Sequence, residues 1–110
     1  MTTSYKVLGQ SAPANTSNAD LYTVPASTEA VISTLLVTNT TGAEVTCRIF
    51  ARVAGEVAAT SNAIIYDGTV AANDFKAITV GITLAATDVI SVQSGTENLL
   101  TFQAFGSEIA

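Results

Sequence analysis

The sequence predicts an all-β fold: an antiparallel β-sandwich, of the jelly-roll or immunoglobulin-like type, with about eight short strands. Three observations lead to this prediction. Of the 110 residues, 36 are Thr, Val or Ile, which are β-branched and fit a pleated, half-buried surface. The apolar residues form short segments separated by turn-forming clusters, with no long segment of helical period. The connections are mostly about four to ten residues long, as in sandwiches and jelly rolls.

The length of the chain fits one domain over residues 1–110. Within it, residues 1–19 are expected to form an extended N-terminal arm or edge strand with a loop. Tyr5–Leu8 is a short strand candidate, and Gly9–Asn18, which is rich in Ser, Ala and Asn, is read as a loop or extended arm. Asp20–Val24 follows as a strand and stops at Pro25, which cannot donate to a central ladder.

The next two segments are the most strongly patterned. Ala30–Thr38 is apolar on both parities, which predicts a strand covered on both faces. Val45–Val53 alternates with period 2, which predicts one core face and one outer face. Its core row is Val45, Cys47, Ile49, Ala51 and Val53, and its outer row is Thr46, Arg48, Phe50 and Arg52.

The rest of the chain adds four strand candidates. The first is ended by the turn pair Asp67-Gly68, and the last two are joined by Ser94–Asn98, which is expected to be a hairpin loop. Between the patterned strands and these candidates, Ala54–Asn62 is a small-residue linker with room for one weak helical turn. The four candidates are Ala63–Tyr66, Lys76–Leu84, Val89–Gln93 and Leu99–Phe105.

Composition excludes several function classes. The chain has no His, so a Ser–His or Cys–His nucleophile and a His metal ligand are ruled out. Four basic against nine acidic residues give a net charge of −5, which lacks the basic footprint of a nucleic-acid binder. No apolar stretch approaches the ~20 residues that span a bilayer. The lone Cys47 is expected to be a small buried hydrophobe. We expect no enzyme activity, no cofactor, no metal and no membrane partner.

Pairs of carboxylates offer the nearest approach to catalysis. The pairs are Asp67 with Asp74 and Asp88 with Glu97, and a glycosidase cleft needs two such acids across a bound sugar. Such clefts usually add aromatic platforms, but the chain has no Trp and three Tyr. A calcium loop over residues 67–74 would place apolar side chains where oxygen ligands belong. We therefore read these acids as turn residues.

Two groups of side chains are candidates for a protein interface. Arg48, Phe50 and Arg52 place two of the four cations around an aromatic expected to be exposed. This stripe is either a contact surface, since Arg and aromatic residues are enriched at interfaces, or a solvent face with the Arg stems covering Phe50. Leu99 and Phe105 make the outer row of the last strand more apolar than a solvent face needs.

Five segments resemble small virion structural proteins, decoration or tail-associated, of tailed bacteriophages, notably phages of marine bacteria and cyanobacteria. They are Lys6–Ser11, Asp20–Ala26, Val31–Asn39, Ala86–Val92 and Phe102–Ile109. The resemblance implies a β-sandwich that is part of the virion. The residues agree with this, since they offer no active site and few charges.

The resemblance fits a capsid role and a tail role alike, and the role we favour is a capsid decoration (cement) protein bound to the major capsid lattice, assembled in the host cytoplasm. The implied partners are the major capsid protein or other virion proteins and further copies of the chain, with a trimer favoured by analogy to capsid symmetry. The alternative is a tail, fibre or baseplate component, including one that binds a carbohydrate receptor. If the stripe is an interface, changing both Arg48 and Arg52 to Glu is expected to weaken assembly and leave folding intact.

Overall fold

The structure, a computed structural model, describes residues 2–14, 16–96 and 99–110. These residues form nine strands and two short 3₁₀ turns, and no α-helix. The elements are β1 (Thr3–Ser11), β2 (Ala19–Thr23), β3 (Glu29–Asn39), β4 (Val45–Arg52), η1 (Val53–Gly55), η2 (Thr60–Asn62), β5 (Ala63–Val70), β6 (Phe75–Ile78), β7 (Ile82–Leu84), β8 (Val89–Ser94) and β9 (Leu100–Ile109).

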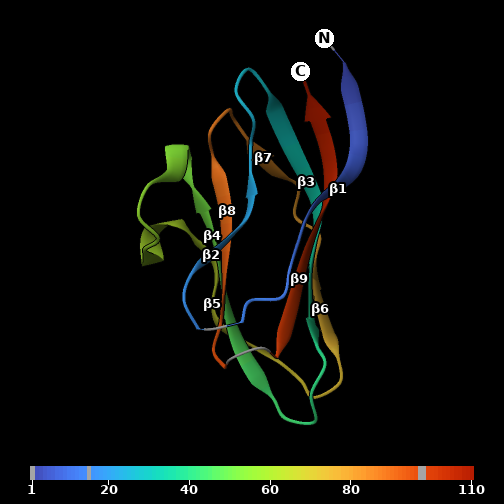
Figure 1. The fold of residues 1–110 in the computed structure, drawn as a ribbon, viewed down its shortest axis with the longest axis vertical. Coiled ribbons are helices and arrows are strands. Elements are labelled where there is room, and N and C mark those ends of the chain that lie inside the picture. The colour runs from blue at the N-terminus through green and yellow to red at the C-terminus, as the bar shows by residue number, and fades with distance from the viewer. Residues whose placement is uncertain (1, 15, 97–98) are drawn as a thin grey trace.

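The strands form two antiparallel sheets that face each other (Figure 1). The first sheet has the order β1-β9-β3-β6, and β7 pairs with β3 beside β6. The second sheet has the order β2-β8-β4-β5. Because β6 and β7 pair with successive parts of β3, they act as one interrupted edge strand. The chain therefore builds two four-stranded layers in the order of a jelly roll, which confirms the predicted sandwich and selects between its two expected types.

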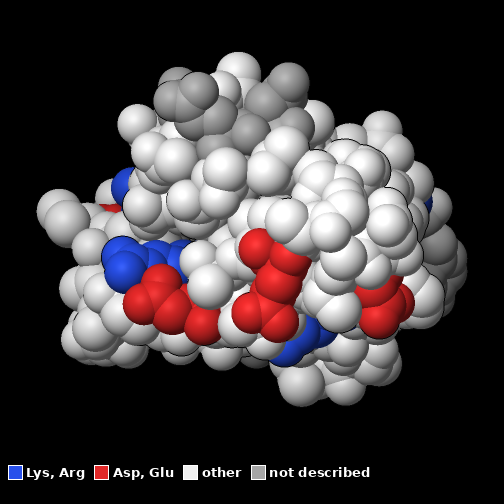
Figure 2. All heavy atoms as spheres, turned by 90° about the horizontal axis from the view of Figure 1, so that it is seen from below, with Lys and Arg blue, Asp and Glu red and all other residues white. Residues whose placement is uncertain are grey.

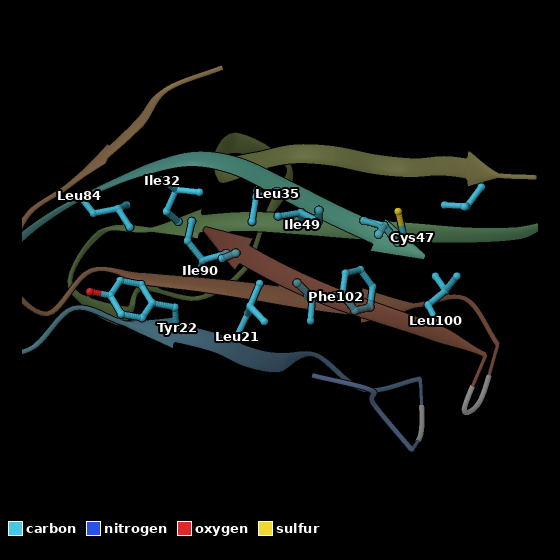
Figure 3. Packing of buried hydrophobic residues seen from close by; sticks show 14 of the residues in the cluster. Leu21, Tyr22, Ile32, Leu35, Cys47, Ile49, Leu84, Ile90, Leu100 and Phe102 are labelled. Carbon is cyan, nitrogen blue, oxygen red and sulfur yellow. The ribbon is translucent and has the colours of Figure 1, made fainter. Parts of the chain in front are cut away.

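The core fills the space between the two sheets (Figure 3). Leu35 of the first sheet and Ile49 and Ile90 of the second are at most 1% exposed. Burial of a side chain of this size contributes roughly 1.5–3 kcal/mol. The predicted core row of β4 is confirmed at Val45, Cys47 and Ile49.

A bulge in β3 explains its two apolar parities. The register between β3 and β9 shifts between Ile32 and Thr34, so the strand gains one residue and its inward row changes parity. Ile32 and Leu35 are therefore both buried in the core, whereas Val31 and Leu36 on the other face stay partly exposed. The expectation that this strand is covered on both faces is wrong.

The bounds of β5 and of the segment with β6 and β7 also differ from the prediction. The segment predicted as one strand over Lys76–Leu84 is split, because Gly81 has a φ of +64° that breaks the extended backbone. As a result Val80 lies between β6 and β7 and is 63% exposed. Asp67-Gly68 does not end β5, which runs on to Val70. The sequence predicts a turn at this pair, whereas in the structure the pair belongs to a bulge.

The last two strands do not form a hairpin. β8 belongs to the second sheet and β9 to the first, so the chain crosses between layers where a hairpin was expected. Residues 97 and 98 of this connection lie outside the described residues. The alternation of β8 and β9 could not reveal this, because it reports which face is buried and not which strand is the neighbour.

The linker between β4 and β5 covers part of the outer face of the second sheet. Its turns η1 and η2 lie against β8 and β4. Underneath, Val89, Ser91 and Phe50 are at most 6% exposed, although they lie on the side of the sheet away from the core. Val53, expected at the end of the core row, lies instead in η1 and is 65% exposed.

Candidate functional site: two outer sheet faces

The outer face of the second sheet carries a locally paired arginine. Arg48 of β4 donates from Nε to Asp67 Oδ1 at 2.7 Å and from Nη2 to Asp67 Oδ2 at 3.2 Å. Its guanidinium also lies 4.0 Å from the centre of the Tyr66 ring. This bidentate bond is the largest cause of the lowered pKa of the Asp67 carboxyl.

A bulge brings these side chains together. Cys47 pairs with Gly68 and Ile49 pairs with Ile65, so Tyr66 and Asp67 together lie opposite the single residue Arg48. The extra residue redirects the strand, as bulges at sheet edges do. Asp67 takes a φ of +55° there, a conformation that Asp tolerates better than most residues.

Beside this pair lies an open groove of about 270 Å³. Gly95 lines it where the turn after β8 approaches β4, and a Cβ on this glycine would lie 2.3 Å from Thr46 Oγ1. The lining contains one cation and one anion, already paired to each other, with neutral hydrogen-bonding groups around them. The polar side chains at the groove are those of Thr16, Thr46, Arg48, Asp67, Gln93 and Ser94.

The second arginine of the stripe has a different role. Arg52 donates to Asp20 Oδ1 at 3.0 Å, to the Glu56 carbonyl at 2.5 Å and to the Gly55 carbonyl at 3.0 Å. It therefore ties η1 and the residue after it to the sheet. Replacing it by Glu would remove these bonds and set a carboxylate beside Asp20, so the expectation that this change leaves folding intact no longer holds.

Phe50, between the two arginines, is buried. It is 3% exposed and meets the Tyr66 ring edge-on, with ring centres 6.5 Å apart. The expectation of an exposed aromatic is wrong, because η1 and η2 fold back over this face. Arg48 thus lines the groove, Phe50 is buried beneath the linker, and Arg52 holds η1 against the sheet.

The outer face of the first sheet is different in kind. Phe105 lies near its centre, between Val7 of β1 and Thr34 of β3. Towards the margins, Tyr5 is 86% exposed and Phe75 is 61% exposed. By strand register the face comprises Thr3, Tyr5, Val7, Gln10, Glu29, Val31, Thr34, Leu36, Thr38, Phe75, Ala77, Thr83, Thr101, Gln103, Phe105, Ser107 and Ile109.

Glu29 is the single charged residue among those that make up this face, and it lies at the end of β3. Leu99 is not part of the face: it precedes β9 and is partly buried against the core.

Figure 2 shows the molecule from the end that carries the turn between β3 and β4, where acidic and basic groups lie next to each other on a mostly uncharged surface.

A third cluster joins the two sheets near the chain ends. Tyr22 of β2 donates its hydroxyl to Glu108 of β9 at 2.5 Å, and Lys6 of β1 lies 2.5 Å from the other carboxylate oxygen. Burial raises the pKa of Tyr22, with the bond to Glu108 adding to it. The bonds from Lys6 and Tyr22 lower the pKa of Glu108. The polar groups of Tyr22, Lys6 and Glu108 are thus partnered within the cluster, which links the two sheets.

The acids considered for catalysis are engaged in local structure. Asp88 accepts the amides of Ala54 and Ala85, and Asp74 accepts that of Phe75. Glu97 lies outside the described residues. Within the described ranges, no three or more His, Cys, Asp or Glu side chains gather where a metal ion could bind. Cys47 is buried as expected, which raises the pKa of its thiol to about 11.

Comparison with known proteins gives one structural likeness. No protein-family model matches the chain, and no curated protein matches its sequence. Among solved structures, the chain is similar to one in the structure of infectious bursal disease virus, Gx strain, with a TM-score of 0.45 and 11% identity. The match covers 97% of this chain and 31% of that one. In the part of the chain that is described, no helix is long and apolar enough to cross a membrane.

Proposed function

We propose that this chain is a non-enzymatic virion structural protein, and specifically a capsid decoration protein that binds the major capsid lattice. The five segments that resemble phage virion proteins support this role. The jelly-roll architecture agrees with it by analogy of fold, because this architecture is used by viral capsid domains as well as by lectins and cupins. The observation that carries the proposal is the nearly uncharged outer face of the first sheet.

The size of this face suits a stable interface. Its longest strand, β3, has 11 residues, and with a rise of about 3.3 Å per residue and four strands about 4.8 Å apart the face covers roughly 700 Å². A standard interface buries about 800 Å² on each partner. Burying this face would desolvate one carboxylate, that of Glu29, so the cost of burying charge stays small.

The composition of the face also fits a protein partner. Monomeric proteins seldom expose large contiguous apolar patches, yet Tyr5, Val7, Phe75 and Phe105 share this surface with Thr, Gln and Ser. Phe105 is the central aromatic, the position at which binding energy concentrates in protein interfaces. We therefore assign the capsid contact to the outer face of the first sheet, with Phe105 at its centre.

Changing Phe105 to Glu tests this assignment. The side chain points away from the core, so the variant should fold, but its carboxylate would be buried unpaired in the interface. We expect at least tenfold weaker co-sedimentation with empty capsids of the virus that encodes the chain, and loss of any rise in capsid disruption temperature. Thr69→Glu, which adds the same charge to an exposed site on β5 of the other sheet, should bind like the wild type. Equal binding by Phe105→Glu and wild type would refute the assignment.

The groove beside Arg48 favours a second candidate function, a tail or fibre component that binds a neutral sugar. Its lining offers donors and acceptors without net charge, which suits vicinal hydroxyl groups, and Tyr66 is half exposed beside it. Titration of the labelled protein with neutral mono- and disaccharides should then shift the NMR signals of Gln93 and of the Arg48 side chain. An unchanged spectrum at about 20 mM sugar, far above millimolar affinity, would exclude this candidate.

A further inference from the structure

We propose that the upper half of β1, Thr3–Val7, is a self-pairing edge. In a two-fold dimer it would add antiparallel to the same segment of a second copy, so that the first sheets of the two copies become one continuous sheet. The inference rests on the proposed function for its biological role, since a virion component occurs in many copies. Its physical basis is independent of that role and lies in the hydrogen bonding, exposure and charge of this segment.

The free edge is defined by the ladder between β1 and β9. Thr2 and Ala110 exchange both backbone bonds, at 2.6 and 2.9 Å. Bonded pairs recur at every second residue of an antiparallel ladder, and the register from Thr3 to Val7 is continuous. Ser4 and Lys6 therefore direct their amides to β9. Thr3, Tyr5 and Val7 direct their N–H and C=O groups away from the sheet.

Among the described strands, none lies opposite these outward groups. β1 is the terminal strand of the first sheet, and every residue from Thr3 to Val7 is exposed, with Tyr5 at 86%. Figure 1 shows this part of β1 at the margin of the molecule, beside β9. A row of unpaired backbone groups on an edge strand is a template for adding another strand.

The features that usually prevent strand addition at a sheet edge, namely proline, bulges and free charges, are weak in this segment. It contains no proline, and the bulge of β1 comes after it, between Val7 and Gly9. Its one charge, Lys6, is the kind of residue that keeps edges apart, but its ammonium is bound to Glu108 of the neighbouring strand. The edge therefore presents no free charge to a partner.

The sequence of the segment complements itself. A two-fold axis through Tyr5 places the two Tyr5 rings opposite each other, an aromatic cross-strand pair of a kind that stabilises sheets. The same axis sets Lys6 against Ser4 of the second copy, so that no like charges meet, and Val7 against Thr3, both β-branched. The outward groups of Thr3, Tyr5 and Val7 then fall on bonded pairs. This symmetry favours a second copy over an unrelated strand as the occupant, and it predicts a dimer where analogy to capsid symmetry favoured a trimer.

The first test is the oligomeric state of the purified protein. We expect analytical ultracentrifugation to detect a monomer–dimer equilibrium, and Tyr5→Pro to weaken it at least tenfold. Proline at this position removes an outward N–H and leaves the bonds to β9 in place, and it is tolerated on edge strands. Val80→Ser, which removes another exposed apolar side chain, should dimerise like the wild type. A wild type that stays monomeric to about 1 mM, or an undiminished dimer in Tyr5→Pro, would overturn the proposal.

Hydrogen exchange on the wild type gives a second readout that needs no variant. The amides of Thr3, Tyr5 and Val7 should become protected as protein concentration rises, whereas those of Ser4 and Lys6 should be protected at every concentration. A dimer that forms without this alternating protection would place the interface elsewhere and contradict the proposal. Both tests use the protein without capsids, so their failure is distinguishable from failure of capsid binding by the Phe105→Glu experiment.

Discussion

At the scale of residues, Glu108 receives two donors from different strands and so links both sheets. Tyr22 comes from β2 of the second sheet, and Lys6 from β1 of the first. The carboxylate form is the one that these donors stabilise, which is why the pKa of Glu108 is lowered in the fold. The sequence does not predict this contact, because Tyr22 and Glu108 are 86 positions apart and no pattern in the two segments pairs them.

The pH dependence of stability tests this link. An unfolded Glu titrates near pH 4.3, so the stabilising contribution of Glu108 is fully present above that pH and is lost as pH falls through the lower folded pKa. The free energy of unfolding of wild type should therefore drop more between pH 6 and pH 3 than that of Glu108→Gln, as measured by urea denaturation. Tyr22→Phe, which removes a hydrogen bond to a charged group, should cost about 1.5–3 kcal/mol at pH 7. Parallel pH profiles for wild type and Glu108→Gln would contradict this account.

At the scale of elements, Arg52 ties η1 and Glu56, at the start of the linker, to the second sheet. Three of its donors hold Asp20 and two carbonyls of the linker, and Phe50 is buried beneath the covered region. The alternation of β4 correctly predicted which side of the strand Arg52 occupies. It could not predict that a linker of small residues would fold back over that side, because nothing in local periodicity encodes such a contact.

Loss of the hydrogen bonds from Arg52 should make this linker more mobile. In Arg52→Ala, we expect faster hydrogen exchange and faster proteolysis over residues 53–62, since the bonds to the Gly55 and Glu56 carbonyls disappear. Arg48→Ala is the matched control, because it removes the other arginine of the strand, whose partner is in β5. Equal protection of residues 53–62 in both variants would show that packing alone holds the linker.

The bulge of β3 depends on a close approach by β9. A Cβ on Gly106 would lie 2.0 Å from the Val31 carbonyl oxygen, a backbone atom that cannot swing aside. Gly106→Ala should therefore push the two central strands apart and destabilise the fold by about 1–3 kcal/mol.

Gly42 supplies the control for this substitution, because a Cβ there would meet nothing within 4 Å. Gly42→Ala should stay within about 0.5 kcal/mol of wild type. Thermal or urea unfolding measures the free energy of unfolding of the two variants. Equal stability would show that the strands shift enough to accommodate the added methyl group.

At the scale of the whole molecule, composition and alternation predicted the class of fold, and long-range pairing decided its topology. β-branched residues and period-2 segments placed most strands within a few residues of their observed bounds. The crossing of the chain from β8 to β9 and the split of the last edge strand at Gly81 depend on contacts between distant segments. The low charge of the chain indicated an interacting surface. Only the sheet register showed that the charged residues avoid the outer face of the first sheet and that Leu99 is not part of that face.

We propose that this chain is a structural component of a virion and decorates its head. The most direct measurement is quantitative mass spectrometry of purified particles of the virus that encodes it, with heads and tails separated. Capsid decoration predicts many copies of the chain in the heads, in fixed proportion to the major capsid protein, and none enriched on isolated tails. Its absence from heads would contradict the claim.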